Sequence, residues 1–173
     1  MANVILGIIG GVLFIGLAVA SAVILGTDFS NASGDAKAAG LAAGGAQIVM
    51  AYNSYIAKEG EYPANYTPEA LMPRYLKASP VNPTNSANAW NSIKFDGTLG
   101  FPAHVYIAGI STDASAGTNI CRSLAEQSRQ TLPATGNPRY ANMAQLPTPV
   151  GCFQPTANFG ALRADRVYAY VKV

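Results

Sequence analysis

Charged side chains are scarce in this sequence. Asp, Glu, Lys and Arg make up 12% of the 173 residues, whereas soluble globular proteins usually contain about 25%. The 11 basic and 9 acidic residues leave a formal net charge of +2, and the basic residues are scattered singly. Because a nucleic-acid surface needs clustered Lys and Arg to neutralise several phosphates, this composition argues against nucleic acid as a partner.

Residues that carry catalysis or bind metals are equally few. The chain has two cysteines, Cys121 and Cys152, and one histidine, His104, which are too few for a zinc site with four protein ligands. The sequence has no glycine-rich phosphate loop and no nucleophile motif, and its Ser, Asp and His residues have no spacing that indicates a triad. We therefore expect no enzymatic activity, no metal and no cofactor.

Charge is missing altogether from the N-terminal part of the chain. The first charged residue is Asp28, and Val4–Gly26 is an uncharged, apolar run of 23 residues. About 20 apolar residues, each rising about 1.5 Å along a helix, cross a hydrocarbon layer of about 30 Å. A cleavable signal peptide would begin with basic residues and have an apolar run of only about 7–15 residues. Residues 1–26 are therefore predicted to form a transmembrane helix.

The orientation of such a helix needs a separate explanation. A membrane anchor is normally oriented by basic residues on its cytoplasmic side, and the first basic residue of this chain is Lys37. We therefore expect that a basic leader preceded Met1 and was removed, so that Met1 is the N-terminus of the mature chain.

Small and bulky side chains alternate along the N-terminal run. Small residues let helix backbones approach closely in lipid, where the hydrophobic effect cannot drive helices together. The residues that we assign to packing between neighbouring helices are Ile5, Gly7, Gly10, Gly11, Phe14 and Gly16. A single anchor that does not assemble is the alternative, because glycine is common in membrane helices generally.

Residues 27–34 interrupt this pattern with weak helix formers. Gly26 and Gly34 lie at the two ends of a stretch rich in Ser, Asn and Asp, which compete for backbone hydrogen bonds, so we predict a helix break there. Residues 35–58 are predicted to be helical again. Their larger apolar side chains recur at three- and four-residue spacing and are Ile48, Val49, Tyr52, Tyr55 and Ile56. The Ala- and Gly-rich first half, Ala36–Ala46, suits close packing between neighbouring helices.

Residues 59–173 are predicted to form a small globular head. Trp90–Phe95 and His104–Ile110 are typical of strands, and Ile120–Gln130 is typical of a short helix. Val167–Val173 alternates between two sets of side chains, which predicts a strand with one buried face. The expected fold class is α+β: a long hydrophobic N-terminal α-helix followed by a small globular head with an antiparallel β-sheet.

Three short stretches of the head resemble the loop that follows the first helix in type IV pilins and pseudopilins. They are Tyr62-Pro63, then Leu71-Met72-Pro73-Arg74-Tyr75-Leu76, and then the turn Pro80-Val81-Asn82-Pro83. Because they follow an apolar N-terminal stretch, the layout of most of the chain is similar to that of the type IV pilin family.

The two cysteines fit the same resemblance. In a head exported beyond a membrane, an even pair predicts a disulfide, and this one would close the loop 121–152. Two independent buried thiols are the alternative. A short helix at Cys121-Arg122-Ser123-Leu124 and a closure at Gly151-Cys152-Phe153 resemble the variable disulfide-closed region of pilins.

The resemblance implies a structural subunit that forms a homo-polymer. In such a family a leader peptidase frees Met1, whose amine is methylated. The subunit waits in the inner membrane, and the pilus assembly machinery then builds an extracellular type IV pilus-like filament for adhesion, motility, DNA uptake or conjugation. Ile5 occupies the position at which type IV pilins usually carry a Glu, so the usual means of setting the register is in doubt, and a Met at the first position resembles the type IVb branch.

Two alternatives stay open from the sequence. The chain could be a minor pilin or a pseudopilin of a secretion system, with the same layout in a different role. It could also be a monomeric, membrane-anchored periplasmic domain whose head binds a small ligand.

Overall fold

The structure is a computed structural model of the 173-residue chain. It describes residues 2–63, 67–84, 90–94, 104–111, 114, 117–141, 145–158 and 160–173, and it describes the side chains of these residues except at positions 2–29, 94 and 104.

The chain forms two compact units, Met1–Gly34 and Asp35–Val173. Helix α1 extends over Ala2–Glu59, so the break predicted over residues 27–34 is not seen. The two glycines expected to cause it, Gly26 and Gly34, both lie within the helix. One glycine costs a helix only about 1 kcal/mol relative to alanine, which is too little to interrupt cooperative hydrogen bonding on both sides.

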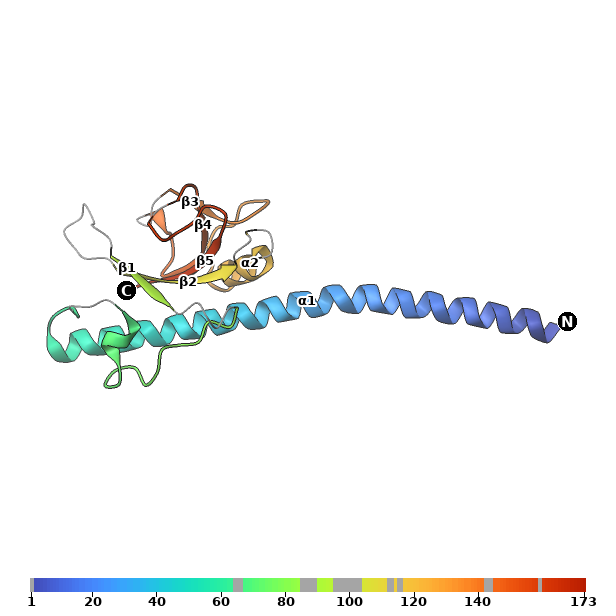
Figure 1. The fold of residues 1–173 in the computed structure, drawn as a ribbon, viewed down its shortest axis with the longest axis horizontal. Helices are drawn as coiled ribbons and strands as arrows, with labels where there is room; N and C mark the ends of the chain where they lie inside the picture. Colours follow the sequence, from blue (N-terminus) through green and yellow to red (C-terminus); the bar gives the residue numbers. More distant parts are fainter. Residues whose placement is uncertain are drawn as a thin grey trace. The chain divides into compact units, whose positions relative to one another are not determined.

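The second unit combines the C-terminal part of α1 with a five-stranded sheet (Figure 1). Its other elements are η1 (Pro68–Leu71), β1 (Asn91–Lys94), β2 (His104–Ser111), α2 (Thr118–Gln127), β3 (Arg139–Tyr140), β4 (Val150–Pro155) and β5 (Val167–Lys172). The strand order is β1-β2-β5-β4-β3, and β5, the last strand in the sequence, is therefore central in the sheet.

The expected fold class is wrong in two respects, although the fold is α+β. The sheet is mixed rather than antiparallel, because β3 pairs with β4 in parallel, with Arg139 opposite Gln154. Parallel strands cannot be joined by a tight two-residue hairpin, and residues 141–149 separate β3 from β4 in the sequence.

The second correction concerns the long hydrophobic N-terminal helix that we expected. Over the part of the chain whose side chains are described, no helix is long and apolar enough to cross a membrane. The exposed helical residues in that part include polar side chains, among them Asn31, Gln47 and Asn53, and also several alanines, while the other side of the helix is buried. A helix that is buried on one side only is typical of packing against a core.

One hydrophobic core lies between the sheet and the two helices. Alternate residues of β5, Val167, Ala169 and Val171, face this core together with alternate residues of β2. The predicted stripe on α1 is confirmed, because Ile48 and Tyr52 are buried in the same core. The other members of the stripe pack against it while partly exposed; they are Val49, Tyr55 and Ile56.

A second core lies on the opposite face of the sheet. Tyr168 and Tyr170 of β5 pack there with Phe153, at ring-centroid distances of 5.7 and 5.9 Å. Leu146 and Leu162 cover them from the connecting segments. The alternation predicted for the last strand is correct, but both of its faces are buried, because loops cover the side that we expected to be open.

The glycines of α1 let the sheet and its connecting segments approach the helix backbone. Carbon atoms of Pro83 and Pro80 lie 3.1 Å from where a Cβ would stand at Gly40 and Gly44. A Cβ at Gly45 would overlap the Cγ2 atom of Val171. The Ala- and Gly-rich stretch was expected to pack against neighbouring helices, yet its glycine side contacts the head of the same chain.

Gly45→Ala tests this close approach. In a helix this change normally stabilises by about 1 kcal/mol, but here we expect destabilisation of about 1–3 kcal/mol, because the new methyl group displaces Val171. Chemical denaturation of the full chain measures the change. In the double variant Gly45→Ala with Val171→Ala the two effects should not add; a Gly45→Ala protein that is more stable than the parent would contradict the packing.

Candidate functional site

A disulfide joins helix α2 to strand β4. Cys121 and Cys152 are bonded, with Cα atoms 5.4 Å apart, and both side chains are fully buried. The bond closes a loop whose ends are 31 residues apart, and on the chain-entropy model a loop of this length stabilises the fold by about 3–4 kcal/mol. The pairing predicted from the sequence is therefore present, and it anchors both ends of a long surface segment to the core.

Gln130 adds a second connection beside the disulfide. Its side-chain Nε2 donates to the carbonyl of Cys152 at 2.9 Å, and its Oε1 accepts from the amide of Cys152 at 3.0 Å. The side chain is only 5% exposed. A single glutamine thus completes both backbone hydrogen bonds of one strand residue, as a further strand would.

The end of α2 directs Gln130 toward the strand. Arg129 has a φ of 56°, in the left-handed region that favours glycine. The amide of Arg129 donates to the carbonyl of Glu126, and the amide of Gln130 donates to that of Ala125. This is the Schellman arrangement that ends many helices, and it reverses the chain so that Gln130 reaches the interior.

Gly151 makes room for this connection. A Cβ at this position would overlap Oε1 of Gln130 and would lie 2.8 Å from the hydroxyl of Tyr170. The Gly151-Cys152-Phe153 stretch therefore has a physical explanation: the glycine admits the glutamine, the cysteine forms the disulfide, and Phe153 packs in the second core.

Gln130→Met should destabilise the chain by about 2–4 kcal/mol, because the buried amide and carbonyl of Cys152 lose their partners while the volume of the side chain is nearly kept. Chemical denaturation measures the loss. The matched control is Gln127→Met on the exposed side of α2, which should cost less than about 1 kcal/mol. Equal effects of the two changes would show that the connection to Cys152 contributes nothing.

The loop segments that follow α1 are fixed to the first core and to β2. Leu71 and Leu76 are buried in the first core. The side chain of Asn82 donates to the carbonyl of Gly109 at 2.7 Å and accepts from the amide of Thr84 at 2.9 Å. The carbonyl that Asn82 reaches belongs to the irregularity in β2 between Gly109 and Ser111, so the turn holds the strand where its regular pairing is disturbed.

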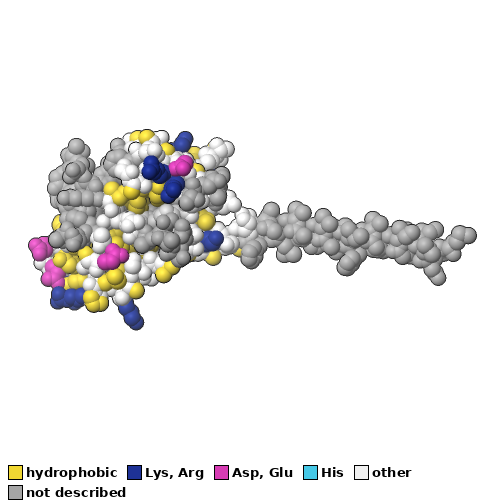
Figure 2. Space-filling view, viewed as in Figure 1, with side chains coloured by type: hydrophobic (Ala, Val, Ile, Leu, Met, Phe, Trp, Pro, Cys, Tyr) yellow, Lys and Arg dark blue, Asp and Glu magenta, His cyan; other side chains and the backbone are white. Residues whose placement is uncertain are grey.

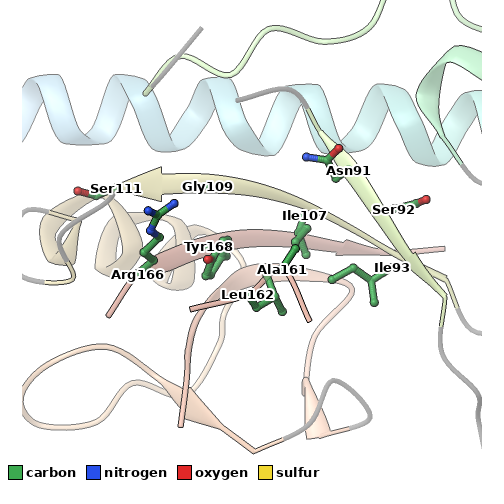
Figure 3. Close-up of a pocket in the computed structure, with 10 residues that line it drawn as sticks. All are labelled: Asn91, Ser92, Ile93, Ile107, Gly109, Ser111, Ala161, Leu162, Arg166 and Tyr168. Carbon is green, nitrogen blue, oxygen red and sulfur yellow. The ribbon is translucent and has the colours of Figure 1, made fainter. Parts of the chain in front are cut away.

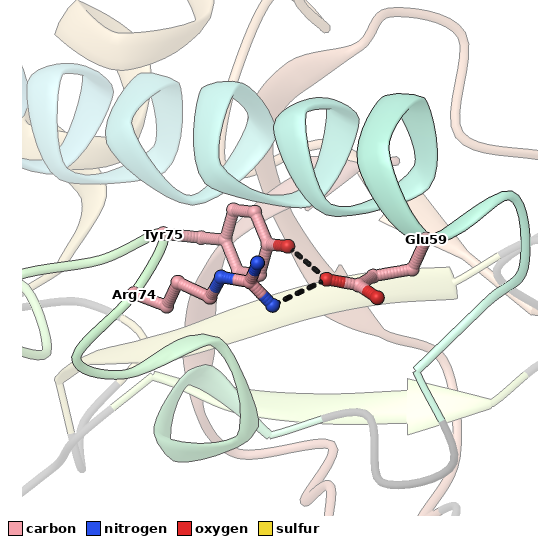
Figure 4. A network of polar contacts seen from close by, with 3 residues as sticks. All are labelled: Glu59, Arg74 and Tyr75. Atoms are coloured by element: carbon pink, nitrogen blue, oxygen red, sulfur yellow. Dashed lines mark hydrogen bonds and ion pairs between the residues drawn. The ribbon is translucent and has the colours of Figure 1, made fainter.

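A polar cluster connects the same loop to the end of α1 (Figure 4). The carboxylate of Glu59 accepts from the Nη1 of Arg74 at 2.8 Å and from the hydroxyl of Tyr75. The ring of Tyr75 packs edge-on against Tyr55 at 5.2 Å, and the ammonium group of Lys58 lies 5.8 Å from its centroid. A surface ion pair alone contributes about 0–1 kcal/mol, so the cluster mainly fixes the geometry of the loop.

The contacts of this cluster change the pKa of Tyr75. The hydrogen bond to Glu59 raises the pKa of Tyr75 above its ordinary value, because the neutral phenol can donate to the carboxylate and the phenolate cannot. The hydrogen bond therefore stabilises the folded state below pH 10.0, the ordinary pKa of tyrosine. This stabilisation is lost as the pH rises through the higher pKa of Tyr75 in the folded state.

Glu59→Gln should therefore lower the pKa of Tyr75 toward the ordinary value, since both the charged acceptor and its negative field are removed. A pH titration followed by NMR of labelled tyrosine measures it. Glu61→Gln removes a carboxylate two residues away and serves as the control, with no change expected. Identical titration curves for the two variants would rule out the Glu59 hydrogen bond as the cause.

Two further tyrosines are perturbed by burial. Desolvation raises the pKa of Tyr106 to about 12, and the charge of Glu69 adds to the effect. Burial also raises the pKa of Tyr170, although a hydrogen bond with Thr148 opposes the shift. Tyr106 packs in the first core and Tyr170 in the second.

Most of the remaining predicted site residues lie outside what the structure describes. Met1 lies outside the described residues, and so do the side chains assigned to helix packing, which are Ile5, Gly7, Gly10, Gly11, Phe14 and Gly16. Within the part of the chain that is described, no group of His, Cys, Asp and Glu could hold a metal ion.

Comparison with known proteins identifies no relative. No protein-family model, no curated protein and no solved structure matches this chain. Function is therefore inferred from the residues and from the geometry of the second unit.

Proposed function

We propose that the chain is a structural subunit that polymerises into an extracellular filament of the type IV pilus kind. The proposal rests on one face of α1, the helix that packs on the sheet with its other face. A leader peptidase, an assembly machinery and further copies of the chain are the partners that it implies.

The observation that carries the proposal is a row of small residues on the exposed face of α1. They recur at spacings of three and four residues, which puts them on one side of a helix. We call this row the alanine face; it consists of Ala36, Ala39, Ala43, Ala46 and Ala57 with the larger Met50 among them, all of them exposed, and the exposed polar Asn53 interrupts it between Met50 and Ala57.

The alanine face differs from an ordinary exposed helix surface. The exposed side of a helix normally carries charged residues, yet residues 38–57 contain none. Met50 is 70% exposed in the middle of the row. Side chains as small as alanine let a second helix approach to the short end of the usual interaxial distance of about 8–10 Å, so the face suits contact with another helix.

Two other features support the proposal. The buried disulfide fits an oxidising environment outside the cytoplasm. On the face drawn in Figure 2, basic and acidic side chains lie singly or in mixed groups and do not form a patch of one sign, so heads of identical charge can lie close to one another with little repulsion.

Ala43→Arg tests the alanine face. Arginine is nearly as good a helix former as alanine, so the subunit should fold with unchanged thermal stability. We expect loss of filaments in material sheared from cells that produce the full chain, seen by electron microscopy, because a long charged side chain would separate neighbouring helices. Ala157→Arg, at an exposed position on the turn after β4, is the control and should leave filaments intact.

Two results would overturn the proposal. One is normal filaments from the Ala43→Arg chain, and the other is a parent chain that is absent from every filament preparation. The ratio of this chain to the total filament mass also separates a main subunit from a minor one.

A further inference from the structure

A hollow of about 430 Å³ opens on the sheet face that carries the second core (Figure 3). Its lining residues come from β1, β2, β5 and the segment before β5. Among them are Ile93, Ile107, Leu162, Arg166 and Tyr168. A volume of this size lies within the range of about 300–1,000 Å³ that is usual for small-molecule sites.

The inner surface of the hollow is apolar. Ile107 and Leu162 are only 6% and 2% exposed, so they form a recessed floor, while Ile93 is half-buried at its edge. The ring of Tyr168 lies beside them, and its hydroxyl accepts a hydrogen bond from the amide of Arg163 at 3.0 Å. A bound molecule would therefore meet hydrocarbon on this floor, and polar groups of Asn91, Ser92 and Ser111 elsewhere in the lining.

One charged side chain lines the hollow. Arg166 is exposed, and among the described residues its guanidinium group makes no hydrogen bond or ion pair with the protein. In Figure 3 Arg166 lies at one end and Ile93 at the other, with Tyr168 and Leu162 between them. The hollow thus has a cation at one end, and at the other the apolar Ile93 with the polar Asn91 and Ser92 near it.

We infer that this hollow binds a small amphipathic monocarboxylate. The carboxylate lies at Arg166, whose planar guanidinium can donate two parallel hydrogen bonds to its oxygens. The hydrocarbon body extends over Tyr168 and Leu162 toward Ile93, which removes apolar surface of both partners from water.

The single cation also determines the class of the anion. A phosphate monoester carries up to two negative charges near pH 7 and is usually held by several cationic or amide donors. Among the described residues that line the hollow, Arg166 is the only Lys or Arg, which matches the one charge of a carboxylate. This inference does not depend on filament formation, because the alanine face takes no part in the hollow.

Octanoate is a suitable probe, and octanamide has the same hydrocarbon body without the charge. Titration of the folded full chain with each, followed by NMR or calorimetry, should show octanoate binding about tenfold or more tightly than octanamide, since charge-assisted hydrogen bonds are the stronger ones. Arg166→Gln should remove this preference and leave octanamide binding unchanged. Ile93→Ser, at a half-buried position, should weaken both probes alike.

Arg163→Gln is the matched control. It removes the same charge three residues away, from an exposed side chain that does not line the hollow, and it should leave the preference for octanoate intact. Three results would overturn the inference: no binding of octanoate, equal binding of the two probes by the parent chain, or an equal loss in the Arg163→Gln and Arg166→Gln variants.

Discussion

The packing of α1 on the last strand of the sheet is the contact on which the rest of the second unit depends. Gly45 brings the helix backbone against Val171, and Gly44 brings it against Pro80 and the indole of Trp90. The two sides of the helix consequently have different surroundings. The glycine side contacts the head of the same chain, and the alanine side is exposed. This division gives the helix a fixed rotation about its own axis relative to the sheet of its own unit.

The disulfide-closed segment is held in a different way. It begins within α2 and ends within β4, and the covalent bond and the side chain of Gln130 connect its first part to β4. Residues 133–136 in its irregular part are exposed. The loop after η1 is fixed by analogous means, with Asn82 bonded to the carbonyl of Gly109 and Glu59 bonded to Arg74 and Tyr75. A few polar contacts, some buried and some on the surface, thereby position two irregular segments.

The regular elements whose apolar residues recur at a fixed spacing were predicted from the sequence. The stripe containing Ile48 and Tyr52, the alternation from Val167 onward and the short helix after Ile120 all appear, because burial on one side leaves a repeat in the sequence. The parallel pairing of β3 was missed, since two residues contain no readable pattern. The role of Gln130 was also missed, because a lone glutamine at the end of a predicted helix shows no sign of the strand that it contacts. The split between the glycine and alanine sides of α1 is visible in the spacing, but only the position of Val171 tells which side is buried.

The strand order has a consequence for how the chain must be made. Synthesis proceeds from the N-terminus, yet the central strand, β5, is made after β2 and β4, the two strands that pair with it. Neither core can close while β5 is still inside the ribosome, because Val167, Ala169 and Val171 belong to one core and Tyr168 and Tyr170 to the other. Until then β2 and β4 each lack one neighbour, and the middle of the sheet is open. The sheet of this unit therefore closes only once β5 has emerged.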